Sequence, residues 1–234
     1  MQREMHQQRD VVHEWGATNR VQFEPSKEAF VVIYPINGSG EDFRMLGCVM
    51  DCKLLMHSAI DAIAKKVRPK IKNLLRMRAF YSVEDLVLQY KTHILPILEC
   101  HNGAIFHAAD SHLAVLDRLQ HSFIHALGMT EATMFLEHNL APLRLRRDIA
   151  ILGLLHKCNL GQVHPLLCRL FRGRYRPNFT FRARRHNKPL HTHIEGVRYL
   201  PGLYQRSLFN MANIYNMLPQ AFLDMILWRV CRAN

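Results

Sequence analysis

Residues 60–78 read IDAIAKKVRPKIKNLLRMR. Their apolar side chains recur at steps of three and four residues, which is the period of one face of an α-helix. These side chains are Ile60, Ile63, Ala64, Val67, Ile71, Leu74 and Leu75. Lysine and arginine fill much of the rest, at positions 65, 66, 68, 70, 72, 76 and 78, and no acidic residue lies between Lys65 and Arg78. The stretch predicts a strongly basic amphipathic helix, bent at Pro69.

Signals for further helices continue along the chain. Serine and threonine favour helix N-caps, proline favours the first turn, and glycine favours the position just past the C-terminus. The expected signals are a capping box at Ser82 and Asp85, N-caps at Ser111 and Thr130, a bend at Pro96, a stop at Gly128, and a helix from Pro142 to about residue 160. Helical spacing returns at residues 203–218, and an apolar terminal helix is expected at 221–230.

Strands are predicted only near the N-terminus, after a short surface helix over residues 2–18. Residues 30–34 are mostly β-branched and aromatic, and the Asn-Gly-Ser-Gly turn at 37–40 separates them from a second run at 43–49. We expect these two runs to pair as an antiparallel hairpin. The predicted fold class is therefore α+β and mostly α-helical, with a small hairpin followed by a helical bundle.

The charge of the chain favours a polyanionic partner. Its 234 residues carry a formal net charge of +12, with 6 basic and 9 acidic side chains in residues 1–64 but 25 basic and 10 acidic in residues 65–234. Clustered cations gain affinity for phosphates by releasing condensed counterions, so nucleic acid is the leading candidate and an anionic membrane the weaker one. No stretch approaches the ~20 apolar residues of a membrane span, and the first residues have no apolar signal core. An intracellular protein, nuclear or cytoplasmic, is expected.

Residues 169–188 combine eight basic with four aromatic side chains and show no helical or strand period. They predict an irregular basic linker, in which the aromatic rings either stack on bases or belong to an unstructured tether. The expected organisation is thus a β-containing segment at 1–56, a helical domain at 57–168, the linker at 169–202 and a helical segment at 203–234.

Short motifs run along the chain in a characteristic order. They are Trp15 with Asn19-Arg20, Pro25-Ser26-Lys27, Leu46-Gly47 ahead of Asp51, KTHILPILE at 91–99, LDRLQ at 116–120, LAPL at 140–143, RRDIA at 146–150, LGLLHK at 152–157 and NMLP at 216–219. In this order the set resembles the C-terminal part of the reverse transcriptase of non-LTR (LINE, jockey-like) retrotransposons. The resemblance covers nearly the whole chain, and it implies that residues 1–56 are the end of a polymerase palm and residues 57–168 a thumb.

The resemblance also implies roles for single residues. Lys27 matches the lysine of palm motif D, which helps to protonate the leaving pyrophosphate; the alternative is that Lys27 is a solvated loop lysine. Leu46 and Gly47 match the primer-grip hairpin of motif E. The family holds two divalent ions with an aromatic-x-Asp-Asp turn, and such ions bridge the attacking and leaving oxygens. This sequence has no Asp-Asp pair. We therefore expect no catalysis by the chain alone, no cofactor in it, and Mg²⁺ only in an intact parent polymerase that supplies the missing N-terminal half.

The predicted partner is RNA, an RNA–DNA hybrid or DNA duplex. Expected phosphate contacts are Lys65, Lys66, Lys70, Lys72 and Arg76 on the basic helix, with Arg144, Arg146 and Arg147 at the start of a later helix. Cations at a helix start oppose the helix dipole, so the three arginines serve either an external anion or a salt-bridged exposed face.

Two other functions stay open on the sequence. The chain is alternatively a decayed or domesticated retroelement remnant that acts as a helical protein-interaction module, or an intact polymerase with unrecognised metal ligands. A metal site is not predicted, because His156, Cys158, His164 and Cys168 lack a Cys-x2-Cys half-site.

Overall fold

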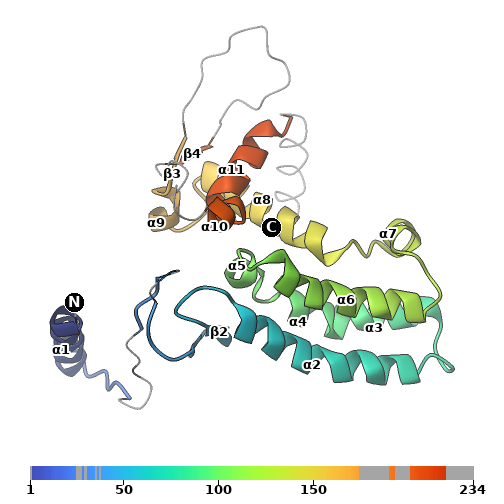
Figure 1. Cartoon of the computed structure of the whole chain (residues 1–234), viewed down its shortest axis with the longest axis horizontal. Helices are drawn as coiled ribbons and strands as arrows, with labels where there is room; N and C mark the ends of the chain where they lie inside the picture. Colours follow the sequence, from blue (N-terminus) through green and yellow to red (C-terminus); the bar gives the residue numbers. More distant parts are fainter. Residues whose placement is uncertain are drawn as a thin grey trace, which may run out of the picture. The chain divides into compact units, whose positions relative to one another are not determined.

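The chain divides into two compact units, Met1–Ser58 and Ala59–Asn234, which are described separately. The computed structural model describes residues 2–24, 28, 31–34, 36, 38–173, 190–192 and 201–219. These residues are mostly helical, with two small antiparallel sheets of two strands each, so the predicted α+β, mostly α-helical class is confirmed (Figure 1). None of the described helices is both long and apolar enough to cross a membrane.

The first unit begins with the expected surface helix, α1 (Gln2–Thr18). Its end is closed by backbone hydrogen bonds, in which Asn19 donates to Trp15 over 3.0 Å and Val21 donates to Gly16 over 2.8 Å. A Cβ on Gly16 would lie 2.3 Å from the ring of Phe23, so only glycine lets the chain turn back this closely.

The predicted strand pairing in this unit is wrong. The hairpin of the first unit joins β1 (Phe43–Met45) to β2 (Cys48–Met50), with Phe43 opposite Met50, so one expected strand folds back on itself. Leu46 and Gly47 form the turn with φ values of 49° and 83°. Positive φ at both central residues is the requirement of a type I′ turn, which matches the twist of the flanking strands.

Residues 31–34 pair elsewhere. Val32 forms an isolated antiparallel bridge with Ser39, and the backbone N–H of Tyr34 donates to the carbonyl of Cys52 over 2.9 Å. The chain therefore reverses direction between Val32 and Ser39, but this reversal does not connect the predicted strand pair. Residues 30 and 37, and also Lys27, lie outside the described residues.

The second unit starts with a bundle of helices. Its elements are α2 (His57–Arg76, whose first two residues belong to the other unit), α3 (Val83–His93), α4 (Leu95–Glu99), α5 (Asn102–Ile105), α6 (Asp110–Ala126) and α7 (Glu131–His138). Tyr90 of α3 and Phe123 of α6 are both fully buried, and their rings stack with centroids 4.4 Å apart. Ile60, Ile63 and Val67 of α2 are also buried. The apolar stripe of residues 60–78 thus forms one wall of the core.

Several helix boundaries follow the local signals. Ser82 caps α3 and accepts from the N–H of Asp85, Thr130 caps α7 by accepting from the N–H of Thr133, and Gly128 closes α6 with a φ of 73°. Pro69 lies inside α2 as predicted.

Two boundaries differ from the expectation. Pro96 does not bend a continuous helix but lies in the first turn of α4, where its missing N–H costs no hydrogen bond. Ser111 does not cap α6, because the helix begins at Asp110 and the extended residue before it, Ala109, is the N-cap.

A second cluster closes the unit. It comprises α8 (Leu143–Asn159), α9 (Pro165–Cys168), β3 (Phe171–Gly173), β4 (Leu190–Thr192), α10 (Pro201–Gln205) and α11 (Leu208–Met217). Leu155, Phe171 and Tyr215 are among its buried core residues. The expected irregular linker at 169–202 therefore contains regular structure, since burial of Phe171 holds β3 against the helices and β3 pairs with β4. The helix expected at 221–230 lies outside the described residues.

Candidate nucleic-acid interface

The basic side chains of α2 are exposed, because the apolar stripe orients them away from the core. Ile60, Val67 and Ile71 are each at most 5% exposed. The basic residues of the helix are all exposed: Lys65, Lys66, Arg68, Lys70, Lys72, Arg76 and, just past the helix, Arg78. One amphipathic pattern therefore determines both the core wall and the cationic surface.

The cations lie on two flanks of the helix. Lys65, Arg68, Lys72 and Arg76 follow one another at steps of three, four and four residues, so they form a row along one flank. Lys66 and Lys70 are four residues apart and form a shorter row on the other flank. We call the four-residue row the cationic row.

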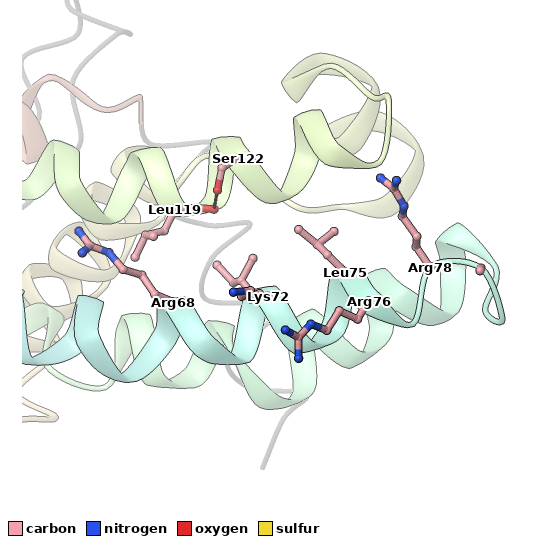
Figure 2. Close-up of a pocket in the computed structure, with 9 residues that line it drawn as sticks. Arg68, Lys72, Leu75, Arg76, Arg78, Leu119 and Ser122 are labelled. Carbon is pink, nitrogen blue, oxygen red and sulfur yellow. Dashed lines mark hydrogen bonds between the residues drawn. The ribbon is translucent and has the colours of Figure 1, made fainter.

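A groove runs beside the cationic row. It has a volume of about 600 Å³ and is lined by Arg68, Ile71, Lys72, Leu75, Arg76, Arg78 and Ala79 from α2 and the following turn, and by Leu119 and Ser122 from α6. Figure 2 shows α2 and α6 alongside each other, with Arg68 and Arg78 extending toward the α6 side and Leu75 between them. The groove has an apolar floor and a rim that carries positive charge.

The cationic surface is not neutralised by the part of the protein that the structure describes. None of the seven basic side chains forms an ion pair with another described residue. Like charges three and four residues apart repel one another on a helix by a few tenths of a kcal/mol per pair. An external polyanion would relieve this repulsion, and the relief would weaken as salt rises.

The arginines of α8 have partners inside the protein. Arg146 donates from Nη2 to Glu99 Oε2 over 3.0 Å and from Nε to the other oxygen of the same carboxylate. The side chain of Arg147 is 5% exposed and donates from Nη2 to both oxygens of Asp117, over 2.8 and 2.9 Å. The hydrogen bonds to Glu99 raise the pKa of Arg146. The geometry favours the salt-bridge alternative for both arginines, although Arg147 is buried rather than on an exposed face.

Arg144 lies in a different setting. It lines a cavity of about 460 Å³ at the start of α8, together with Arg147 and Arg206 and with three carboxylates, Asp110, Asp117 and Asp148. Burial raises the pKa of Asp148, and the charge of Asp110 adds to this shift, while Arg144 and Arg147 oppose it. Equal numbers of acidic and basic side chains make this cavity a poorer phosphate site than the α2 groove.

The residues implied by the polymerase resemblance lie in the first unit. Leu46 is 96% exposed at the tip of the β1–β2 hairpin, and Gly47 beside it is exposed as well. A hairpin with its turn in solvent is thus present at these positions. Its predicted primer-grip role, and the motif D role of Lys27, stay predictions.

Residues considered for a metal have other contacts. His156 Nδ1 lies 2.9 Å from the hydroxyl of Tyr215, and the thiol of Cys168 lies 3.8 Å from the carbonyl of Cys158. Burial lowers the pKa of His156 and raises that of Cys158. Within the described ranges, no three His, Cys, Asp or Glu side chains are grouped so that they could hold a metal ion.

Comparison with known proteins adds no assignment. No family model, no curated protein and no solved structure matches the chain.

The structure adds residues that the sequence prediction of phosphate contacts left out. Arg68 belongs to the cationic row, and Arg78 lies at the end of the groove. The spacing of Arg68 relative to Lys65 and Lys72 is that of one helix flank, and this signal could have identified Arg68 as a phosphate contact. No comparable signal identified Glu99 and Asp117 as the partners of Arg146 and Arg147, because those pairs are 47 and 30 residues apart.

Proposed function

We propose that the chain binds nucleic-acid duplex through α2 and that it is the C-terminal part of a retrotransposon-type reverse transcriptase. In this function the helical unit holds template–primer duplex, whether RNA, RNA–DNA hybrid or DNA, as a polymerase thumb does. The catalytic carboxylates would come from a separate polymerase half. The order of the sequence motifs supports the polymerase origin, and the surface of α2 supports the binding.

The observation that carries the binding proposal is a cationic surface that has no ion-pair partner among the described residues. Lys65, Arg68, Lys72 and Arg76 are exposed, and none of them pairs with a described acidic side chain. By contrast, Arg146 and Arg147 show how this fold neutralises cations that have a structural use. The difference supports assigning the phosphate contacts to α2 and a stabilising role to these two arginines of α8.

The dimensions of the row suit a duplex. From Lys65 to Arg76 the helix rises by roughly 16 Å at 1.5 Å per residue. That is the axial length of about five base pairs at 3.4 Å per step. Cations spaced along one helix flank can therefore follow consecutive phosphates of one strand, as shape-based recognition of a duplex requires.

The test is a titration of a short duplex at several salt concentrations. Counterion release predicts that the logarithm of the binding constant falls linearly with the logarithm of salt, by about 0.9 per phosphate contact on DNA. The variant Lys65→Glu/Lys72→Glu should lower the affinity and reduce this slope by about 2, since two contacts are lost. Adding Lys66→Glu, Lys70→Glu and Arg76→Glu should reduce both further.

The matched control is Lys53→Glu/Lys157→Glu, which changes the net charge equally at two exposed lysines outside α2. It should leave most of the affinity and the slope in place. Equal effects of the two double variants would mean that only net charge matters, and an affinity that ignores salt would refute phosphate binding altogether. Helical circular dichroism of each variant shows that it is folded.

A further inference from the structure

The turn between α2 and α3 presents apolar side chains to solvent. Phe80 is 85% exposed, Tyr81 is 45% exposed and Met77 is 43% exposed. Single exposed apolar side chains are ordinary on protein surfaces, but neighbouring ones indicate a contact site. These three lie within five consecutive residues, 77–81, and the basic residues Arg76 and Arg78 flank the first of them.

The turn is ordered rather than loose. The backbone N–H of Met77 donates to Leu74 over 3.1 Å, that of Arg78 donates to Leu75 over 3.3 Å, and that of Phe80 donates to Met77 over 2.9 Å. On the other side, Ser82 caps α3. The backbone that carries Phe80 is therefore held at both ends of the turn, so it would lose little backbone entropy on binding a partner.

The turn also closes one end of the α2 groove. Arg78 and Ala79, which immediately precede Phe80, line the groove together with Lys72 and Arg76 (Figure 2). A strand that follows the cationic row toward the end of α2 thus reaches the turn that carries Phe80 and Tyr81. Positive charge beside aromatic rings is the combination that binds the backbone and the bases of single-stranded nucleic acid.

We propose that Phe80, assisted by Tyr81, stacks on unpaired bases where the duplex held along α2 ends in a single strand. The preferred ligand is then a duplex with a single-stranded overhang. Bases inside a duplex are stacked on each other and offer no free face, so only an overhang or an end can use these rings. This inference rests on the proposed function, because the row on α2 places the duplex.

The experiment compares a blunt duplex with the same duplex carrying an overhang, by fluorescence anisotropy. The native protein should bind the overhang duplex more tightly. Phe80→Ala should weaken that binding by about 5- to 150-fold, the usual effect of losing one base–aromatic stack. It should weaken blunt-duplex binding less, because a blunt duplex offers only its terminal base pairs to the ring. Because no charge is lost, the salt slope should stay the same. An abasic overhang should abolish the difference between Phe80→Ala and the native protein.

Further variants separate stacking from general hydrophobicity. Phe80→Trp should retain the overhang preference and Phe80→Leu should lose most of it, because leucine is apolar but has no ring face. Trp15→Ala removes an aromatic side chain that is 57% exposed in the first unit and is the matched control. Trp15→Ala should leave the affinity for both the blunt duplex and the overhang duplex unchanged. A 2-aminopurine base in the overhang should be quenched by the native protein and not by Phe80→Ala.

The outcomes distinguish the two proposals. If Phe80→Ala binds both ligands like the native protein while Lys65→Glu/Lys72→Glu binds them more weakly, the stacking inference is wrong and the duplex surface stands. If Lys65→Glu/Lys72→Glu binds both ligands like the native protein, the proposed function is wrong, and the stacking inference that rests on it is wrong as well.

Discussion

Replacing Arg147 by alanine is expected to destabilise the helical unit by about 2–3 kcal/mol without changing its affinity for nucleic acid. The side chain of Arg147 is 5% exposed and donates to both oxygens of Asp117, so the substitution removes a two-point, charge-assisted contact between α8 and α6. The same residue was predicted from the sequence to contact phosphate, so stability and binding measurements on one variant separate the two roles.

The magnitude follows from the exposure of the two partners. Breaking a buried ion pair costs about 3–5 kcal/mol, whereas a surface pair contributes about 0–1 kcal/mol. Arg147 is buried but the side chain of Asp117 is 37% exposed, so water still screens the carboxylate. We therefore expect a value between these limits, to which the lost packing of the arginine stem also contributes. In a unit of this size, about 2–3 kcal/mol corresponds to a fall in Tm of roughly 5–10 °C.

The assay is thermal unfolding followed by helical circular dichroism, with Arg147→Ala, Asp117→Ala and the double variant in a cycle. The double variant should be more stable than the sum of the single effects predicts, because each single change leaves a charge without its partner. Arg144→Ala is the matched control, since Arg144 is exposed on the same helix. It should change the stability by less than about 0.5 kcal/mol. An Arg147→Ala variant as stable as Arg144→Ala, or one with a reduced salt slope for duplex binding, would refute the structural role.

Two further predictions concern His156 and a helix cap. Burial lowers the pKa of His156 below its unfolded value of about 6.5. The stability that neutral His156 contributes is therefore complete above pH 6.5 and is lost as the pH falls from there toward the folded pKa. The loss is at most about 1.4 kcal/mol per pH unit. His156→Gln should therefore show a flatter decline of Tm between pH 7 and 5, and an unchanged profile would contradict this assignment. Ser82→Ala should lower the free energy of unfolding by about 1 kcal/mol, because α3 loses its N-cap. Ser111→Ala should be nearly neutral, because Ser111 is not a cap. Equal losses of stability in chemical denaturation would show that these helix starts are wrong.

The sequence by itself determined the features that depend on neighbours within one or two helical turns. The period of residues 60–78 predicted both the buried and the cationic side of α2, because a helix converts spacing directly into faces. Ser82, Thr130 and Gly128 ended or began helices where expected, since a cap satisfies backbone groups only a few residues away. The exposure of the candidate phosphate contacts on α2 followed from the same local pattern.

Only the tertiary structure decided which distant groups meet. Arg146 with Glu99, Arg147 with Asp117, and His156 with Tyr215 are separated by 47, 30 and 59 residues, and no local pattern distinguishes these partners from other acidic or polar side chains. Hairpin register was likewise undecided, since two short β-prone runs can pair with each other or fold back within one run. The structure takes the second arrangement, with positive φ values at Leu46 and Gly47 in the turn. Long-range contacts form only after loop closure, so they depend on the packing of the whole chain rather than on its local preferences.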